Sequence, residues 1–469
     1  MVSNVVSIQL IQNRSRWDFA SYNPSYDSAL KAIRESSHAY YPLGELVTSF
    51  KYGASIPADY IDQGILFIRA QNIREHGVDL SDTRYVSEDT PGLEGHFAET
   101  GDILITRSGI NVGDAVSIPP FLAGSAHGSY SIRLRLKNEI VSPEYLAIVI
   151  NSSVVRAQIK AFKGRSAQPN INIAELSRLQ ILLPPRPTQE RIAQVMQEAY
   201  AAQRAKLAGA EKLLNTANEF VLKELDISTA NLKDEKRFLV NASRIAGQRF
   251  DISTYNTKYA GLILELQNKF GPNLVSLRSI SYPITSGATP LGSNYTDEGI
   301  VFLRVQNISN DGSIDFNNTL FVSPKFAKTI ERSAIQNDDL LLVIVGATIG
   351  KCAVAKNISF PVVPNQAIAR IRVREDVAID PDFLQAFLRS QAGQIQIDTL
   401  KRPVAQGNLN LTEAGQILVP HVPPETQKAI VEAITHRRAE AKRLRAEAEQ
   451  VVTNAKAQVE RMILGEEDA

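Results

Sequence analysis

The sequence predicts an α+β protein: two tandem mixed α/β domains, each followed by a long helix, with the two helices paired as an antiparallel coiled coil and related by pseudo-two-fold symmetry. Three observations predict this fold, namely an internal duplication, short alternating strands within each copy, and a helical apolar stripe after each copy. The length of 469 residues exceeds one ordinary domain, and 44% hydrophobic with 22% charged residues is typical of a globular protein.

The internal duplication is clearest in one ten-residue string. Residues 64–73 read GILFIRAQNI and residues 299–308 read GIVFLRVQNI, an offset of 299 − 64 = 235. Gln189 matches Gln427 at an offset of 238, and near the start of each copy the offset falls to 233. Because the offset drifts so little, each copy is a whole domain with an appendage rather than a short solenoid repeat.

Each copy shows the same order of elements. Short alternating strands between Gly, Asn, Asp and Pro turns are expected in the first copy at residues 65–70, 102–106 and 131–136. The helical segments expected beside the strands are 27–36 and 143–159 in the first copy, with 257–270 and 381–397 in the second. A domain of roughly 150 residues is large enough to hold one core.

A proline cluster closes each domain, and a long helix is expected after it. Apolar residues recur at three- and four-residue spacing from Ile434 to Met462, and a similar stripe covers about 189–225. Such helices need a partner for the stripe, and the other copy is the obvious one. A helix of about 37 residues would give a rod on the order of 55 Å. The expected boundaries are 1–184 for the first domain, 185–226 for the first helix, 227–422 for a linker and the second domain, and 423–469 for the second helix.

Composition narrows the function classes. The single cysteine, Cys352, rules out an internal disulfide and a cysteine-rich zinc site, and the six histidines show no pair at ligand spacing, so no metal is expected. No signal-peptide pattern and no apolar run of about 18 residues is present, which favours a cytoplasmic protein without membrane association. The net charge of +1 is low for a lone DNA-binding protein, but it suits a subunit that shares its contacts with partners.

Two segments resemble catalytic motifs, but each lacks part of the motif. Residues 23–26 (NPSY) resemble an adenine methyltransferase motif, but the second copy lacks the proline. Residues 346–352 (GATIGKC) resemble a phosphate loop with one residue too few between the glycines and Cys in place of Ser or Thr. The sequence therefore predicts no catalytic residue and no bound cofactor.

Three further strings stand in a fixed order in the first copy: GILFIRAQNI at 64–73, GDILITRSG at 101–109, and NIN at 170–172 leading to Leu-Pro-Pro and a Gln-Glu-Arg-Ile helix start. Together with the duplication and the helix after each domain, they resemble the specificity subunit of type I restriction–modification enzymes, over about residues 14–465. One departure is Ile344 in the second copy at the place of Arg107.

The resemblance implies a division of roles. Each globular domain would be a target-recognition domain that reads one half of a split sequence in double-stranded DNA, and the helices would hold the halves apart and dock two modification (methyltransferase) subunits. Those subunits would bring S-adenosylmethionine chemistry, and restriction subunits would bring translocation and cleavage, so this chain would not itself be an enzyme. Two alternatives stay open: one chain carrying both recognition and methyl transfer, and a coiled-coil scaffold protein that binds no DNA.

The repeat also sorts the candidate DNA contacts. Polar residues identical in both copies cannot distinguish two different half-sites, so they are expected to be scaffold or phosphate contacts. They are Arg69, Gln71, Asn72, Arg304, Gln306 and Asn307. Base contacts are expected at polar loop positions that differ between the copies. In the first domain these are Lys51, Tyr52, Arg107, Ser108, Asn111, Lys163 and Arg165, and in the second Thr285, Ser286, Thr289, Thr348, Lys351, Lys401 and Arg402. The two basic loops, at 163–165 and 401–402, predict a phosphate contact.

Overall fold

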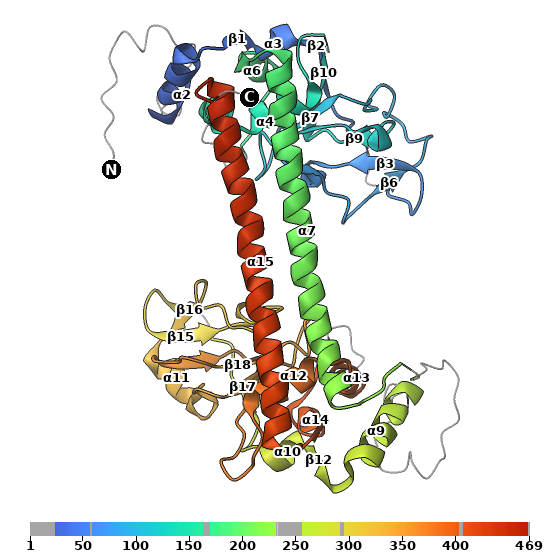
Figure 1. Cartoon of the computed structure of the whole chain (residues 1–469), viewed down its shortest axis with the longest axis vertical. Coiled ribbons are helices and arrows are strands. Elements are labelled where there is room, and N and C mark those ends of the chain that lie inside the picture. Colours follow the sequence, from blue (N-terminus) through green and yellow to red (C-terminus); the bar gives the residue numbers. More distant parts are fainter. Residues whose placement is uncertain are drawn as a thin grey trace. The chain divides into compact units, whose positions relative to one another are not determined.

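The computed structural model describes residues 24–56, 59–137, 139–162, 169–230, 232, 256–290, 295–402 and 407–467. The chain divides into two compact units, one made of residues 1–206 with 446–469 and the other of residues 207–445. Each unit therefore holds one globular domain together with part of both long helices, which Figure 1 labels α7 (Arg186–Glu224) and α15 (Pro424–Leu464).

The globular part of the first unit is built on an antiparallel sheet in the order β2-β10-β7-β8, next to a second sheet in the order β6-β3-β9. The strands are β1 (Ala39–Pro42), β2 (Val47–Tyr52), β3 (Ile65–Ile68), β4 (Ile73–Arg74), β5 (Gly77–Val78), β6 (Tyr85–Val86), β7 (Ile103–Thr106), β8 (Ala115–Ser117), β9 (Ala126–His127), β10 (Ser131–Leu136) and β11 (Gln180–Leu183). The helices are α2 (Pro24–Glu35), α3 (Leu43–Leu46), η2 (Ala70–Asn72), η3 (Pro120–Leu122), α4 (Pro143–Asn151), α5 (Ser153–Phe162) and α6 (Ile173–Leu176).

The second unit repeats this topology, with sheets in the orders β13-β20-β17-β18 and β14-β16-β15-β19. Its strands are β12 (Leu274–Ser276), β13 (Thr285–Ser286), β14 (Tyr295–Thr296), β15 (Ile300–Leu303), β16 (Leu320–Val322), β17 (Leu340–Val343), β18 (Cys352–Val354), β19 (Val362–Pro364), β20 (Ile368–Ile371) and β21 (Leu418–Pro420). Its helices are α9 (Thr257–Phe270), η5 (Gly271–Asn273), α10 (Leu277–Ile280), η7 (Val305–Asn307), α11 (Pro324–Thr329), η8 (Glu331–Ser333), α12 (Pro381–Arg389), α13 (Gln391–Leu400) and α14 (Leu411–Ala414). The predicted mixed α/β duplication is confirmed.

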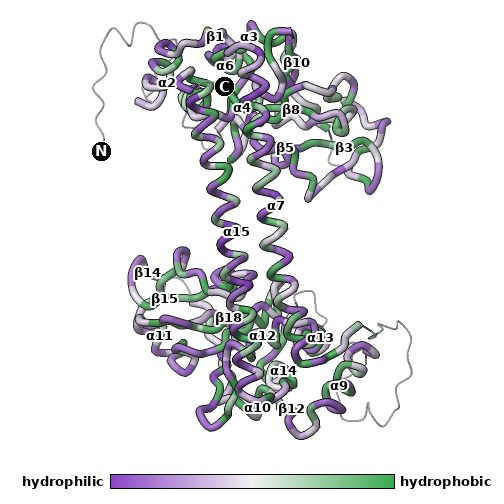
Figure 2. The backbone as a smooth tube through the Cα atoms, in the orientation of Figure 1, coloured by the Kyte–Doolittle hydropathy of each residue, from purple (hydrophilic) through white to green (hydrophobic). Residues whose placement is uncertain are grey.

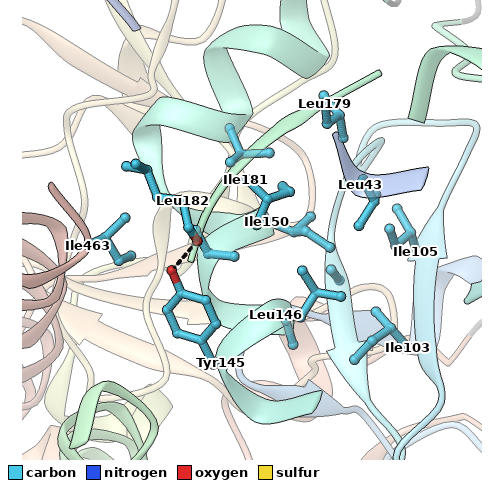
Figure 3. Close-up of a cluster of buried hydrophobic side chains, with 14 of the residues drawn as sticks. Leu43, Ile103, Ile105, Tyr145, Leu146, Ile150, Leu179, Ile181, Leu182 and Ile463 are labelled. Atoms are coloured by element: carbon cyan, nitrogen blue, oxygen red, sulfur yellow. Dashed lines mark hydrogen bonds between the residues drawn. The ribbon is translucent and has the colours of Figure 1, made fainter. Parts of the chain in front are cut away.

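In the first unit, the apolar face of the larger sheet packs against α4 and β11, and the end of α15 joins the same core (Figure 3). Tyr145 is fully buried there, and its hydroxyl donates to the Leu182 carbonyl at 2.6 Å. Ile463, near the end of α15, is also fully buried. The last turns of the C-terminal helix are therefore part of the first domain's core rather than a free appendage.

The segments predicted to be helical after β10 and β20 each form two helices instead of one. Ser152 separates α4 from α5, and Ser390 separates α12 from α13, both with extended backbone. The Ser152 hydroxyl donates back to the Val149 carbonyl at 2.6 Å, and the Ser390 hydroxyl donates to Phe387 at 2.7 Å. Serine competes with the helix for its own backbone carbonyls, which explains the break at the same place in both copies.

The expected antiparallel pairing of the long helices is confirmed within each unit. In the first unit, Lys206 of α7 forms an ion pair with Glu447 of α15 at 2.6 Å. In the second, the Arg437 guanidinium of α15 lies 4.3 Å from the ring centroid of Phe220 near the end of α7. Hydrophobic and hydrophilic residues alternate along both helices (Figure 2), as expected for helices that bury one stripe. No helix in the described ranges is long and apolar enough to cross a bilayer.

Candidate nucleic-acid interface

The junction between domain and helix is built identically in the two units by a buried glutamine. Gln189 accepts a hydrogen bond from the Ser142 N–H at 2.9 Å and donates to the carbonyls of Ile140 and Pro184 at 3.3 and 2.9 Å. Gln427 repeats the arrangement with the Asp380 N–H at 2.7 Å and with two carbonyls at 2.8 Å. Each long helix therefore leaves its domain in a direction fixed by three hydrogen bonds.

A buried aspartate holds the larger sheet of each unit. Asp102 accepts from the Arg135 Nε and Nη2, both at 3.1 Å, and Asp339 accepts from the equivalent atoms of Arg372 at 2.7 Å. Asp102 and Asp339 are at most 3% exposed. Because both halves keep this pair at matching positions, it belongs to the common scaffold.

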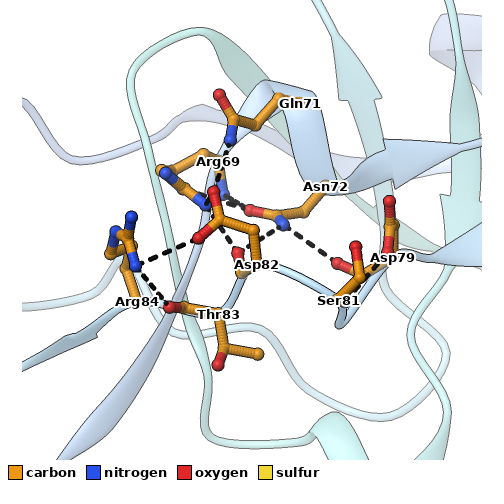
Figure 4. Close-up of polar contacts among 8 residues, drawn as sticks. All are labelled: Arg69, Gln71, Asn72, Asp79, Ser81, Asp82, Thr83 and Arg84. Carbon is orange, nitrogen blue, oxygen red and sulfur yellow. Dashed lines mark hydrogen bonds and ion pairs between the residues drawn. The ribbon is translucent and has the colours of Figure 1, made fainter. Parts of the chain in front are cut away.

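The shared Arg-x-x-Asn residues form an internal hydrogen-bond network (Figure 4). The Arg69 N–H and Nε donate to the Asn72 side-chain oxygen, and its Nη2 donates to the Asp82 carboxylate at 2.9 Å. The Asn72 amide donates to the carbonyls of Asp79 and Asp82. Hydrogen bonding to Arg69 lowers the pKa of the Asp82 carboxyl. These contacts favour the scaffold role over direct contact with DNA for Arg69 and Asn72.

The second unit has the same turn with a smaller network. Asn307 accepts from the Arg304 N–H at 2.9 Å and donates to the carbonyls of Asp315 and Asn318 at 3.1 and 3.0 Å. Arg304 Nη2 donates to the Asn318 carbonyl at 3.1 Å, as Arg69 Nη2 does to the Asp82 carbonyl, but the additional bond to the Asp82 carboxylate has no equivalent among the described contacts of Arg304. The turn geometry is kept in both copies, which explains why the sequence repeats there.

Some of the predicted contacts that differ between the copies lie at or beside the loop after β7. The Arg107 guanidinium lies 4.6 Å from the Tyr52 ring centroid, and its Nη2 donates to the Asn170 side-chain oxygen at 3.4 Å. Its Nε is buried without a hydrogen-bond partner among the described residues. The loop also exposes Ile110 completely, and Tyr130, in the turn between β9 and β10, is 57% exposed. A cation held beside exposed aromatic and apolar side chains is suited to a nucleic-acid surface.

The sequence pointed to Asn170 only as part of the NIN string, and it did not single out Ile110, Tyr130 or the residue that anchors this loop. Arg156 of α5 donates to the Asp114 carboxylate at 2.5 Å and to the Val112 carbonyl at 3.1 Å. The only available signal was the pair of glycines at 109 and 113, both with positive φ, which bracket a loop that must turn sharply. Of the other predicted contacts there, Ser108 is 8% exposed and Asn111 is half-buried.

Lys51 lies next to Tyr52 in β2 but on the opposite face, because side chains alternate along a strand. It is paired in register with Arg133 of β10. The predicted set in the first domain is therefore split between the two faces of one sheet. Lys163 and Arg165 lie outside the described residues.

The predicted contacts of the second unit are tied to local partners. Thr285 on β13 accepts from Arg370 Nε at 3.2 Å, and the Thr289 hydroxyl bonds to the Gln366 side chain. The Ser286 carbonyl accepts from Ser333, and the carbonyl of Thr348 accepts from the Lys351 N–H, closing the turn after β17. Lys401 pairs with Asp398 at 2.6 Å, and Arg402, with a 54% exposed side chain, pairs with Glu413 at 3.1 Å.

The comparisons with known proteins converge on one family. The model of the type I restriction modification DNA specificity domain matches residues 51–228 and 281–450. The type I restriction enzyme EcoBI specificity subunit of Escherichia coli is 25% identical over 295 residues, which is 62% of this chain and 56% of that protein. The match thus spans little more than half of the relative.

Three solved structures resemble this chain along nearly its whole length, each over 91% of it. One chain, from a structure of complex assembly and conformational transition of the type I R-M system, is 16% identical with a TM-score of 0.49 and 96% of its length covered. The HsdS subunit from Thermoanaerobacter tengcongensis (15%, 0.37, 95% covered) and the type I S subunit from M. genitalium (14%, 0.42, 96% covered) are also similar. Because the family model matches well over half of the residues, the chain belongs to the family of type I restriction–modification DNA specificity domains.

Proposed function

We propose that this chain is the non-catalytic specificity subunit of a type I restriction–modification complex and that it binds an asymmetric, bipartite target in double-stranded DNA. In this proposal residues 1–184 and 227–422 contain the two target-recognition domains, and residues 185–226 and 423–469 the helical spacers. Family membership and the duplicated architecture support it. The proposed setting is the cytoplasm.

One observation carries the proposal: the scaffold is the same in both units and the candidate reading surface is not. The glutamine junction and the buried aspartate are repeated almost atom for atom. The Arg107–Tyr52 pair of the first unit has no counterpart, because Ile344 takes the place of Arg107 and is 4% exposed. Two recognition domains that share a scaffold but differ in their candidate DNA-contacting surfaces suit two different half-sites.

The partners follow from the same reading. Two modification (methyltransferase) subunits would dock on the paired helices and supply the S-adenosylmethionine chemistry, and restriction subunits would supply translocation and cleavage. The chain itself would contribute direct and phosphate contacts to DNA, with Arg107, Tyr52, Lys51, Lys163 and Arg165 in the first half. In the second half the contacts would come from Thr285, Ser286, Thr289, Thr348, Lys351, Lys401 and Arg402. Arg69, Asn72, Arg304 and Asn307 would hold the scaffold or contact phosphates.

The decisive experiment is to map the methylated motif in the genome of the host and compare it with a strain lacking this gene. We expect a bipartite motif with a fixed gap and two unlike halves. A contiguous motif, or no change in methylation, would contradict the proposal. Binding of the purified chain with its modification subunits to target and scrambled duplexes, at several salt concentrations, separates specific from purely electrostatic binding. A scaffold protein that binds no DNA would show neither specific nor electrostatic binding to these duplexes.

A further inference from the structure

One face of the larger sheet has opposite chemistry in the two units. In the first unit, Thr106 of β7 is paired in register with Ser131 of β10, and His127 ends β9 on the neighbouring sheet. In the second unit the same register positions hold Val343, Ile368 and Pro364. Val343 and Ile368 are buried in an apolar cluster. The fold therefore needs no polar group at these positions, although the first unit places three there.

The polar groups of the first unit are buried and incompletely bonded. Thr106 is 1% exposed, His127 0% and Arg133 8%. The hydroxyl of Thr106, Nε2 of His127 and Nε of Arg133 have no hydrogen-bond partner in the part of the chain that the structure describes. An unsatisfied buried polar atom destabilises a fold, so three on two neighbouring sheets require an explanation.

The hydrogen bonds of His127 show which edge of its ring is left open. Its Nδ1 lies 3.0 Å from the Ser131 hydroxyl, which donates its own proton to the Gly128 carbonyl at 2.8 Å. Nδ1 is therefore the donor, and Nε2, on the other edge of the ring, is the unpartnered atom. The charged neighbours that act on the His127 ring are Arg133, His96, Asp102 and Lys51.

Positive charge is concentrated at the same place. Lys51 stands directly opposite Arg133 across β2 and β10, a pairing of like charges that destabilises a sheet. The nearby Asp102 is bonded to Arg135 and forms an ion pair with the Nε of Arg133 at 3.7 Å, and the Nη1 of Arg133 donates to the Phe97 carbonyl. In the second unit the residue opposite Arg370 is Thr285, which accepts the Nε hydrogen bond at 3.2 Å. Thr285 thus supplies a hydrogen-bond acceptor for the arginine Nε, which Lys51 at the same register position of the first unit cannot do.

His96, in the loop between β6 and β7, lies beside His127. Its ring centroid lies 6.3 Å from that of His127, and its Nδ1 is 2.9 Å from the Tyr52 carbonyl. The ammonium of Lys51 rests against Gly95, the preceding residue, whose φ is +72°. Lys51 and His96 are both half-buried, so they are more accessible to solvent than Thr106, His127 and Arg133.

We propose that Lys51, Thr106, His127 and Arg133 form a binding site for a phosphate-type oxyanion that is present in the first unit alone. Lys51 and Arg133 supply charge-assisted donors, and the Thr106 hydroxyl supplies a neutral one. The same chemistry is offered by a DNA backbone phosphate and by free inorganic phosphate. The site is unrelated to the Arg107–Tyr52 surface, which lies on the other face of the sheet.

Occupancy by an anion would also change the protonation of His127. Burial, followed by the charge of Arg133, lowers its pKa to about 3. A phosphate group adjacent to Nε2 adds the opposite charge and an acceptor, which favours the protonated ring. Phosphate binding is therefore coupled to proton uptake by His127.

The first test measures thermal unfolding of the full-length chain against inorganic phosphate, with chloride balancing the ionic strength. We expect phosphate at ten times its Kd to raise Tm by about 2–4 °C. Lys51→Thr, which installs the residue of the second unit, should lose this response or weaken phosphate binding by about tenfold. Thr106→Val is a second, nearly isosteric variant with the same expected loss. Lys31→Thr, on an exposed helix, is the matched control and should respond like the parent chain.

The second test identifies the source of the phosphate. Target duplexes carry single uncharged methylphosphonates at successive positions. If the site takes a DNA phosphate, one position weakens binding by the parent chain about tenfold and leaves Lys51→Thr unaffected, and inorganic phosphate competes with the duplex. If the site takes free phosphate, no position distinguishes the two proteins while the Tm response persists.

The proposal is overturned if neither a phosphate response nor a position-specific duplex effect is seen in the parent chain. It is also overturned if Lys51→Thr keeps the full response, because the anion then binds elsewhere. The unfolding test needs no DNA. The unfolding test therefore stays informative if the chain proves not to bind DNA. Conversely, a chain that shows no phosphate response could still have the proposed DNA-binding function.

Discussion

Gln189 and Gln427 make the same three hydrogen bonds in the two units, each joining the first turn of a long helix to the residues just before it and to the loop before α4 or α12. Both side chains are at most 2% exposed. A glutamine that pairs one N–H and two carbonyls is a rigid connector, because each bond restrains a different rotation of the helix. The two helices are thus extensions of their domains rather than flexible tethers.

Replacing Gln189 by leucine should therefore lower stability. The substitution removes the Gln189 hydrogen bonds of the buried Ser142 N–H and Pro184 carbonyl and one bond of the more exposed Ile140 carbonyl, which should cost about 2–4 kcal/mol. Urea unfolding followed by circular dichroism measures the change. Gln194→Leu, at an exposed position of the same helix, is the control and should change the free energy of unfolding by about 0.5 kcal/mol or less. Equal losses of unfolding free energy in Gln189→Leu and Gln194→Leu would contradict the role of Gln189 as a connector.

Arg107→Ala should weaken DNA binding through the first half-site alone. The change removes the cation beside Tyr52 and should cost about 1–3 kcal/mol of discrimination there. Competition binding against duplexes with either half scrambled measures this. The variant should lose part of the difference in affinity between the intact target and a target whose first half is scrambled. Arg178→Ala, on an exposed turn of the same domain, is the control. A uniform loss across all sequences would mean that Arg107 contacts phosphate and not bases.

Much of the fold follows from local sequence patterns. The strand predicted at 131–136 is observed as Ser131–Leu136, because its alternation matches a sheet with one apolar and one polar face. The shared Asn-x-Asn motif also has a local cause. Asn172 and Asn410 each cap a short helix, with Glu175 and Glu413 returning the hydrogen bond. Patterns that act within four residues can be read from one sequence.

The candidate sites were harder to predict because they depend on segments far apart in the chain. Arg107 meets Tyr52 and Asn170 only after β2, β7 and the loop before α6 come together. The polar face formed by Thr106, His127 and Arg133 likewise combines three strands, and each residue alone is an ordinary strand residue. The duplication drew attention to the turn at Arg69, whose side chains bond to neighbours in their own unit, but register decides which side chains share a face.

Stability should fall as the pH is lowered from about 6.5 toward 3, and His127 should account for part of that loss. Its pKa is lowered to about 3 by burial and by Arg133, so between these values the unfolded chain binds a proton that the folded chain does not. Unfolding is then favoured by up to about 1.4 kcal/mol per pH unit for this one group. The measurement compares urea midpoints at pH 7 and pH 5 in phosphate-free buffer.

The corresponding control is His127→Leu, which cannot take up a proton. It should reduce the difference between the two midpoints, even if its stability at pH 7 is lower. His436→Leu, at an exposed position of α15, should leave the difference unchanged. An unaltered pH dependence in His127→Leu would show that carboxylates and other histidines account for the whole effect.

Removing one heptad from each long helix should change the gap between the two half-sites while keeping their sequences. Residues 203–209 and 442–448 are a matched pair, because Lys206 faces Glu447 and Gly209 lies against Leu444. Seven residues correspond to about 10 Å of helix, or about three base pairs, so the preferred gap should shorten by about that amount or methylation should cease. Sequencing of methylated sites in a host carrying the shortened chain measures the gap. Deleting the heptad from α7 alone puts the facing residues out of register and should abolish methylation at every gap, whereas a shortened chain that methylates the original gap would show that the helices do not set the distance.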